Sequence, residues 1–336
     1  MSFLIKHLFH LGIGFFIMWL LSKIPFKYFY NSSLLIFGFA VLLVCWAISG
    51  GESINGANAS RWIRVVGFTF QPSELAKVSL FVLLARNLVH YKDKLKSFKH
   101  SFIPILGPVI LICGLILPSN FSTSAIIFMI SFLIMFVGRY SLKWLSIMLF
   151  IGLGSLASFY AVVTTYPTIS NRVATWNSRI ECYLDNDCIS YQVHHAKMAI
   201  ARGGIWGKGP GKSVEKNFLP QSSSDFVYAV IIEEYGRFGG LFVIFLYLSL
   251  LFRVLKIASK CDDDFAVLMV IGLGISIVSQ AFINMAVAVS LLPVTGQTLP
   301  LISAGGSSVW MTCAALGLIL SISNGLPKPE SAELND

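Results

Sequence analysis

Long apolar stretches alternate with short polar connections along the whole chain. A helix needs roughly 20 predominantly apolar residues to cross the hydrocarbon core of a membrane. The apolar stretches run approximately over residues 3–22, 33–50, 72–89, 102–118, 121–138, 144–163, 226–252, 265–292 and 303–323. The pattern therefore predicts an all-α polytopic integral membrane protein with nine transmembrane helices.

The composition excludes the other broad classes of protein. Only 12% of the 336 residues are charged, whereas a typical soluble domain has about 25%. Apolar residues make up 56% of the chain and the mean hydropathy is +0.76, which excludes intrinsic disorder as well. The net charge of +9 comes from basic residues scattered between apolar stretches, so we expect no nucleic-acid partner.

Basic residues between the predicted helices indicate their orientation, because cytoplasmic connections of membrane proteins are enriched in lysine and arginine. Alternate connections and the C-terminal tail share this enrichment: Lys23, Lys27, Arg86, Lys92, Lys94, Lys96, Lys99, Arg139, Lys143, Arg253, Lys256, Lys260 and Lys328. We expect this side to be cytoplasmic, which places the N-terminus and the loop 164–225 outside. That loop is far longer than ordinary connections, so its length alone makes it a functional candidate.

The outer loop contains a glycine-rich segment, Gly203–Lys212, followed by Lys216. Glycine allows close approach to the backbone and lysine supplies positive charge, so this segment could hold phosphate groups. Its glycine spacing is not that of a P-loop. A flexible, solvated surface loop is an equally good interpretation of the same residues.

Cys182 and Cys188 lie close together in the outer loop, on the oxidising side of the membrane. Either they form a disulfide that closes a small turn, or they are two free thiols, because the sequence does not give their distance. No spacing typical of metal ligands is present, so no metal site is assigned to protein side chains.

Two groups of charged residues fall within predicted helices, where charges are costly. Glu74 and Lys77 are three residues apart, so they share a helix face. Glu233, Glu234 and Arg237 form the second group, in which Glu233 and Arg237 are four apart. We expect internal ion pairs that fix helix packing in both groups; direct participation in chemistry is the alternative.

Asp225 ends the outer loop and directly precedes an apolar stretch. An aspartate in this position is typical of a helix N-cap, and by itself that interpretation is favoured. The other interpretation is a carboxylate at the outer membrane surface that acts as a general base beside a basic loop.

Three segments resemble the SEDS family of polytopic peptidoglycan glycosyltransferases, typified by FtsW and RodA. They are Gly56–Ile63 with Phe70–Lys77, Leu219–Gly236 and Leu291–Ser308. Their order and spacing match the family, and the similarity covers nearly the whole chain. Residues 1–336 are therefore expected to form a single SEDS membrane domain that includes the loop 164–225. The sequence of Gln297–Ser303 resembles the FtsW branch more than the RodA branch.

The resemblance implies a reaction, a location and partners. Family members polymerise lipid II into glycan strands at the outer face of the bacterial cytoplasmic membrane. The acceptor's 4-hydroxyl attacks the anomeric carbon with inversion, which forms a β-1,4 linkage and releases undecaprenyl pyrophosphate. The FtsW branch implies septal synthesis with a class B penicillin-binding transpeptidase and other divisome membrane proteins. A divalent cation, Mg²⁺ or Mn²⁺, could assist the leaving group.

The resemblance also implies roles for particular residues. The family's essential loop aspartate matches Asp225, which is therefore expected to be the base. Gln221 and Ser223 replace the family's usual glutamate and histidine, which leaves Asp225 as the only carboxylate of its segment. The expected substrate-binding residues, from family matches and from charge, are Arg61, Lys77, Lys208, Lys212, Lys216 and Ser307.

One departure from the resemblance concerns the N-terminus, and two other functions remain as alternatives. Family members usually have ten helices with a cytoplasmic N-terminus, and the segment around residues 10–25 resembles their second helix. Either the coding sequence begins further upstream, which we favour, or the chain lacks the first helix.

A flippase for lipid II and a non-catalytic division scaffold are alternative functions; against the flippase, the sequence has no inverted repeat.

Overall fold

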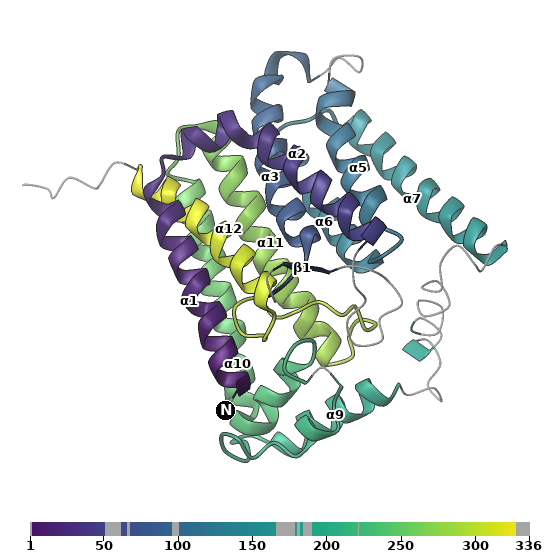
Figure 1. The fold of residues 1–336 in the computed structure, drawn as a ribbon, viewed down its shortest axis with the longest axis vertical. Helices are drawn as coiled ribbons and strands as arrows, with labels where there is room; N and C mark the ends of the chain where they lie inside the picture. Colours follow the sequence, from purple (N-terminus) through teal and green to yellow (C-terminus); the bar gives the residue numbers. More distant parts are fainter. Residues whose placement is uncertain are drawn as a thin grey trace, which may run out of the picture.

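A computed structural model of the chain describes residues 2–50, 62–65, 68–95, 101–165, 179, 182–183, 190–220 and 222–326. The described part is a bundle of helices (Figure 1). The helices of the bundle are α1 (Ser2–Lys23), α2 (Phe26–Gly50), α3 (Pro72–His90), α5 (Gly107–Ile116), α6 (Phe121–Val137), α7 (Leu142–Thr165), α10 (Val227–Ala258), α11 (Asp264–Ala288) and α12 (Gly306–Asn324). The shorter elements are β1 (Ile63–Val65), β2 (Phe68–Phe70), η1 (Lys92–Lys94), the π-helix η2 (Phe102–Leu106), α9 (Tyr191–Gly203) and η4 (Glu215–Asn217).

Each predicted transmembrane stretch corresponds to a helix in the described part of the chain. Five helices, α1, α2, α10, α11 and α12, are long and apolar enough to cross a membrane. Shorter apolar helices are formed by η2 with α5 (Phe102–Ile116), by α6 (Phe121–Val137) and by the first part of α7 (Leu142–Ser155). The main difference is that α2 begins at Phe26 instead of residue 33. The hydroxyls of Ser32 and Ser33 donate to the carbonyls of Tyr28 and Tyr30, which lets the helix accommodate its polar residues.

Helix α3 is at the centre of the bundle. It packs against α2, α5, α6, α11 and α12, and 14 of its 19 residues are buried. Pro72 occupies its first turn, where the missing N–H has no helical partner to lose. Near its other end, the amide of Asn87 donates to the carbonyl of Pro104 in η2 at 2.6 Å. The central position of α3 explains why its charged residues need internal partners.

Helices α1 and α12 lie side by side (Figure 1) and approach closely at glycines. A Cβ atom on Gly317 would lie 2.8 Å from the carbonyl oxygen of Met18. A Cβ atom on Gly306 would lie 2.8 Å from the imidazole ring of His10. Small residues at such positions allow the close packing that stabilises helices in membranes. The close packing therefore explains why a glycine occupies position 306, which lies in the matched segment Leu291–Ser308.

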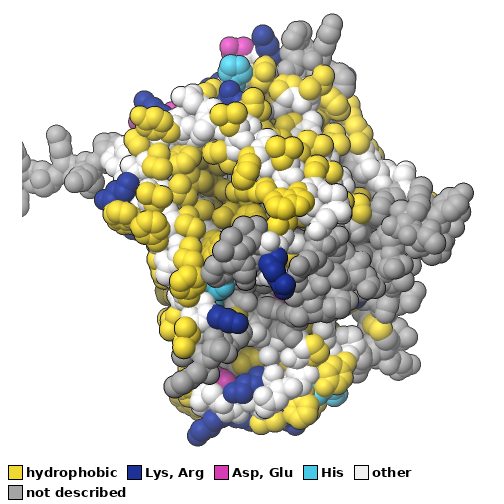
Figure 2. All heavy atoms as spheres, viewed as in Figure 1, with side chains coloured by type: hydrophobic (Ala, Val, Ile, Leu, Met, Phe, Trp, Pro, Cys, Tyr) yellow, Lys and Arg dark blue, Asp and Glu magenta, His cyan; other side chains and the backbone are white. Residues whose placement is uncertain are grey.

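Apolar side chains cover much of the surface in Figure 2. Large exposed hydrophobic residues occur along α2, α7 and α10, for example Leu35, Phe150 and Phe245. A soluble protein rarely exposes contiguous apolar surface of this extent, whereas contact with lipid requires it. The chain is a multi-pass membrane protein.

Strands β1 and β2 and helix α9 were not predicted from the sequence. Strands β1 and β2 form an antiparallel hairpin, in which Ile63 pairs with Phe70, directly before α3. The all-α prediction missed this hairpin because three-residue strands carry almost no periodic signal. Helix α9 lies within the predicted outer loop, and Ser190 caps it by accepting a hydrogen bond from Val193 N.

Candidate active site

Asp225 lies in a turn directly before α10, and its side chain is partly exposed. The N-cap of α10 is Phe226, so the interpretation of Asp225 as the helix N-cap is wrong. The Asp225 carboxylate accepts a hydrogen bond from the Ser224 hydroxyl, with 3.0 Å between Oγ and Oδ1. The structure therefore keeps this carboxylate at a surface and gives it a polar neighbour.

The segment 299–304 holds the main chain on the N-terminal side of Asp225. Ser303 Oγ donates to the carbonyl of Ser224 at 2.5 Å and accepts from Leu299 N at 2.7 Å. The amide of Ala304 donates to the carbonyl of Ser223 at 2.9 Å. The second and third of the matched sequence segments thus meet in space, which the sequence order alone does not show.

The segment before Ser303 also lies against Asp225. A Cβ atom on Gly296 would lie 3.5 Å from Asp225 Oδ2, so the Gly296 backbone is next to the carboxylate. From α11, the amide of Asn284 donates to the carbonyls of Asp225 and Gln297 at 2.8 and 2.7 Å. Hydrogen bonds therefore hold Asp225 from both α11 and the connection between α11 and α12.

The predicted ion pair between Glu74 and Lys77 is confirmed. Lys77 Nζ lies 2.9 Å from Glu74 Oε2, and both side chains are buried. Lys77 also donates to Gln280 Oε1 at 2.7 Å, and the amide of Gln280 donates to the carbonyl of Thr298 at 3.1 Å. A small cavity between α3, α11 and α12 is lined by Glu74, Lys77, Gln280 and Thr312, among others. The pair thus connects α3 with α11.

The backbone of the glycine-rich segment is bound to α10. The amides of Lys208 and Gly209 donate to the carbonyls of Glu233 and Glu234 at 3.0 and 2.9 Å. In return, the amide of Arg237 donates to the carbonyl of Gly204 at 3.1 Å. The amides of Lys208 and Gly209 therefore bond to helix carbonyls and are not available to phosphate, whereas a phosphate-binding role for the lysine side chains stays a prediction.

Gly236 makes this contact sterically possible. Its φ is +72° and its ψ is −171°, a conformation inside α10 that is essentially restricted to glycine. A Cβ atom there would lie 2.1 Å from the carbonyl oxygen of Ile205. The resulting kink turns the first part of α10 away from the regular helix and lets the outer loop pack against its backbone.

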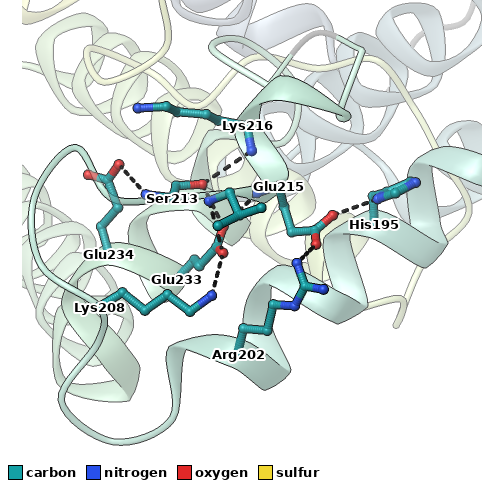
Figure 3. Close-up of polar contacts among 9 residues, drawn as sticks. His195, Arg202, Lys208, Ser213, Glu215, Lys216, Glu233 and Glu234 are labelled. Atoms are coloured by element: carbon teal, nitrogen blue, oxygen red, sulfur yellow. Dashed lines mark hydrogen bonds and ion pairs between the residues drawn. The ribbon is translucent and has the colours of Figure 1, made fainter.

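The predicted pair between Glu233 and Arg237 is wrong. Gly236 interrupts the helix between them, so the usual four-residue spacing no longer places the two side chains on one face. Instead, Glu233 accepts hydrogen bonds from Lys208 Nζ at 3.2 Å and Ser213 Oγ at 2.5 Å (Figure 3). Its oxygens also accept from the amides of residues 214 and 215 at 3.2 Å each, and its side chain is 0% exposed.

Glu215 is a second buried carboxylate of the outer loop, and sequence reasoning gave it no role. It accepts hydrogen bonds from Arg202 Nη1 and from the ring nitrogen Nδ1 of His195, the latter at 2.5 Å (Figure 3). The His195 ring also stacks against Phe218, with ring centroids 5.7 Å apart. These contacts fasten α9 to η4, so the loop has a polar core of its own.

The residues expected to bind substrate are in different environments. Lys212 is exposed, whereas Lys208 is paired with Glu233 and Lys216 Nζ donates to the carbonyl of Gly211 at 2.8 Å. Ser307 is buried and accepts a hydrogen bond from Gln71 N at 3.2 Å. Binding roles for these residues and for buried Lys77 stay predictions.

Some predicted residues are not covered by the structure. Arg61, Gln221 and Cys188 lie outside the described residues. Cys182 is disulfide-bonded. Because Cys188 lies outside the described residues, its pairing with Cys182 stays a prediction. Within the described ranges, no three His, Cys, Asp or Glu side chains come together as a metal site.

Sequence reasoning also missed two polar residues of α11, Gln280 and Asn284, which contact the ion pair and Asp225, respectively. A signal for them is present in the sequence: they are four residues apart in an apolar helix, so they share one face. Polar residues in a transmembrane helix face the protein interior and mark functional positions. Gln280 and Asn284 carry no charge, so a criterion based on charged residues within helices does not identify them.

Comparison with known proteins agrees with this arrangement. Residues 1–327 match the cell cycle protein family of FtsW, RodA and SpoVE. The chain belongs to this family. Among curated members, a protein of Polynucleobacter necessarius is 36% identical over 328 residues, covering 95% of this chain and 76% of its own length. A protein of Coxiella burnetii is 31% identical over 327 residues, which cover 95% of this chain and 86% of its own length. Both are named "Probable peptidoglycan glycosyltransferase FtsW".

Solved structures of the FtsW, RodA and SpoVE family have the same fold. One chain, from work on "Structural coordination of polymerization and crosslinking by a peptidoglycan synthase complex", has a TM-score of 0.76 and 26% identity. The match covers 97% of this chain and 91% of that one. The rod shape determining protein RodA of Thermus thermophilus has a TM-score of 0.69 at 24% identity, with 97% and 89% covered, and supports the fold alone. The predicted family and fold class are thus confirmed.

Proposed function

We propose that this protein is a peptidoglycan glycosyltransferase that polymerises lipid II into glycan strands, with Asp225 as its general base. The observation that carries the proposal is the partly exposed Asp225 carboxylate on a main chain that Ser303, Ala304 and Asn284 hold by hydrogen bonds. A base needs this combination of access and fixed position. The names of the curated relatives support the reaction class.

In the proposed reaction, the carboxylate of Asp225 takes the proton from the acceptor's 4-hydroxyl. The oxygen attacks the anomeric carbon of the donor from the side opposite the pyrophosphate, so the new bond is β-1,4 and the configuration inverts. The bond to the pyrophosphate breaks, and undecaprenyl pyrophosphate leaves with the electron pair. The hydrogen bond from Ser224 to Oδ1 fixes the orientation of the carboxylate for this transfer.

The leaving pyrophosphate needs positive charge. We propose that Lys212, which is exposed, and Arg61, which the family resemblance implies, supply it, with Lys208 and Lys216 in the same loop as Lys212. A divalent cation, Mg²⁺ or Mn²⁺, would take most of its ligands from the pyrophosphate, because no group of three acidic, histidine or cysteine side chains occurs in the described residues. Chelation with EDTA should then reduce the rate without changing the thermal unfolding of the protein.

The proposed site of action is the outer face of the bacterial cytoplasmic membrane at the division septum. The lysine-rich connections support this orientation, and the FtsW relatives support septal synthesis. Likeness to a chain of a peptidoglycan synthase complex supports a class B penicillin-binding transpeptidase as partner. We propose other divisome membrane proteins as further partners, from the resemblance to the FtsW branch alone. Midcell localisation of a fluorescent fusion, with recovery of the transpeptidase by pull-down, tests both points; a sidewall pattern would contradict the septal role.

Substitution of Asp225 by asparagine tests the reaction. Asparagine keeps the shape but cannot accept the proton, so polymer formation from lipid II should fall by about 10²–10⁴-fold. Thermal unfolding should stay unchanged. The matched control is Asp263→Asn: Asp263 caps α11 by accepting from Phe265 N and Ala266 N, and asparagine caps as well as aspartate. Full activity of Asp225→Asn would reject the base.

The same preparation distinguishes the alternative functions. A flippase would move fluorescent lipid II across liposome membranes, and its transport would not depend on polymer formation. A non-catalytic scaffold would recruit the transpeptidase equally well as wild type and as Asp225→Asn, with no polymer in either case. Polymer formation that Asp225→Asn abolishes, with partner recruitment unchanged, supports the enzyme.

A further inference from the structure

Asn284 lies on α11, one turn from the end of the helix, and is 1% exposed. Its side-chain nitrogen donates to two carbonyls from different segments, Asp225 O at 2.8 Å and Gln297 O at 2.7 Å. Since both neighbours are acceptors, only the NH₂ group of the amide can face them, which fixes the orientation of the side chain. One buried amide therefore joins the segment that carries Asp225 to the segment before α12.

The segment before α12, which contains Gln297, is also bound to α6. The side-chain amide of Gln297 is buried and donates to Thr123 Oγ1, at the start of α6, at 2.9 Å. Directly before it, Gly296 has a φ of +68° and its backbone lies next to Asp225 Oδ2. Asn284 thus sets the distance between the main chain of Asp225 and the backbone that lies against its carboxylate.

The other atom of the Asn284 amide makes no such contact. Within the residues that the structure describes, Asn284 Oδ1 has no hydrogen-bond partner, although it is buried. A buried acceptor without a partner lowers stability, and this cost reduces what the two donated hydrogen bonds add to stability. The contribution of Asn284 therefore lies in its two donated hydrogen bonds.

We propose that Asn284 is a positioning residue for glycosyl transfer, which holds the main chain of Asp225 so that the carboxylate reaches the acceptor hydroxyl. The proposal rests on the proposed role of Asp225 as base. Loss of the amide leaves two carbonyls without their shared donor and lets the two segments move apart. A displacement of about 1 Å at a reacting group can reduce a rate by about 10²-fold. The charged residues of the outer loop, which bind substrate in the proposed function, are not touched.

Kinetics of lipid II polymerisation by the full-length protein tests the proposal. The variants are Asn284→Ala and Asn284→Asp, of which the second keeps the size of the side chain. Both should lower kcat by about 30–100-fold and change KM by less than about threefold. The matched control is Ser276→Ala, which removes a buried hydroxyl from the same helix about two turns away and should leave kcat unchanged.

A double-mutant cycle separates positioning from general damage to the fold. In the Asp225→Asn background, Asn284→Ala should add no further loss, because the group that it positions no longer acts. A further multiplicative loss in the double variant would overturn the proposal, as would a kcat of Asn284→Ala equal to wild type. Rates are expressed per mole of folded protein, and if the alanine variant folds poorly, the cycle is run with Asn284→Asp.

Failure of the positioning role and failure of the base are distinguishable. An inactive Asp225→Asn with a fully active Asn284→Ala rejects the positioning role alone. A fully active Asp225→Asn rejects the base and, with it, the positioning role.

Discussion

Two groups of carboxylates lie at the outer end of α10 and use their polar neighbours in different ways. Around Glu233 and Glu215, the polar neighbours bind the carboxylates themselves: lysine, arginine, histidine, serine and backbone amides contact the carboxylate oxygens, and both side chains are buried. Around Asp225, the hydrogen bonds from Asn284, Ser303 and Ala304 go to main-chain carbonyls, and the carboxylate remains partly exposed.

The difference separates charges that hold the structure from a charge that can react. The sequence alone does not distinguish one acidic residue of the outer loop from another. It likewise suggests that all basic residues of the loop form one positive surface. In the structure, the buried carboxylates pair with Lys208 and Arg202, whereas Lys212, at the end of the glycine-rich segment, is exposed. Charge density in a sequence is therefore a poor measure of the charge that a substrate meets.

Substitution of Glu233 by alanine should give the largest loss of stability. It removes the acceptor of Ser213, Lys208 and two backbone amides, and breaking a buried ion pair in this way costs about 3–5 kcal/mol. We expect the lower end of that range, because the Lys208 side chain is 33% exposed. Hydrogen exchange over residues 203–216 should increase strongly. Glu234→Gln is the control, since Glu234 is partly exposed, and equal exchange in both variants would contradict the distinction.

Gly236→Ala should give the next largest effect. Alanine is strained at a φ of +72° and a ψ of −171°, at a cost of about 1–3 kcal/mol, before its overlap with the Ile205 carbonyl is considered. The outer loop should detach from α10 and become sensitive to limited proteolysis. Gly12→Ala is the control: a Cβ there meets nothing within 4 Å, so the α1 helix should keep or slightly gain stability. Resistance of Gly236→Ala to protease would argue against the kink as the anchor of the loop.

The smallest expected effect comes from Lys212→Gln compared with Lys208→Gln. Lys212 is exposed, so its loss should raise KM for lipid II by less than about tenfold, since an exposed charge contributes about 1 kcal/mol or less. Thermal unfolding of this variant should not change. Lys208→Gln, by contrast, should lower stability, because Lys208 is paired with buried Glu233. The same kinetic and thermal behaviour in both variants would remove the difference between the two lysines.

Much of the fold could be predicted because helix formation in a membrane depends on local sequence. Hydropathy predicted the stretch 72–89, which the structure has as α3 (Pro72–His90), and the Glu74–Lys77 pair followed from spacing within one helix. The pairing of Glu233 with Arg237 was predicted by the same rule and was wrong. The rule assumes a regular helix, and Gly236 breaks that assumption in a way that one glycine in a sequence does not reveal.

The candidate site was predictable in part. Asp225 stood out through family resemblance, but as an isolated residue it was best interpreted as a helix cap, and the structure assigns the N-cap position to Phe226. A network runs from Lys77 through Gln280 and Thr298 to the segment that Asn284 binds. It links residues that are far apart in the sequence, because Lys77 and Gln280 are separated by 203 positions. No local pattern reports such contacts.

By itself, the sequence determined the membrane class, the positions of the helices, their expected orientation and the family, because apolar length, charge asymmetry and matched segments are properties of the chain read in order. The tertiary structure decided which polar groups are available. It directed the amides of the glycine-rich segment to α10, paired Lys208 with Glu233, and brought Asn284 to the main chain of Asp225. The physical reason is that buried polar groups must find partners, and those partners are set by packing between segments that are distant in sequence.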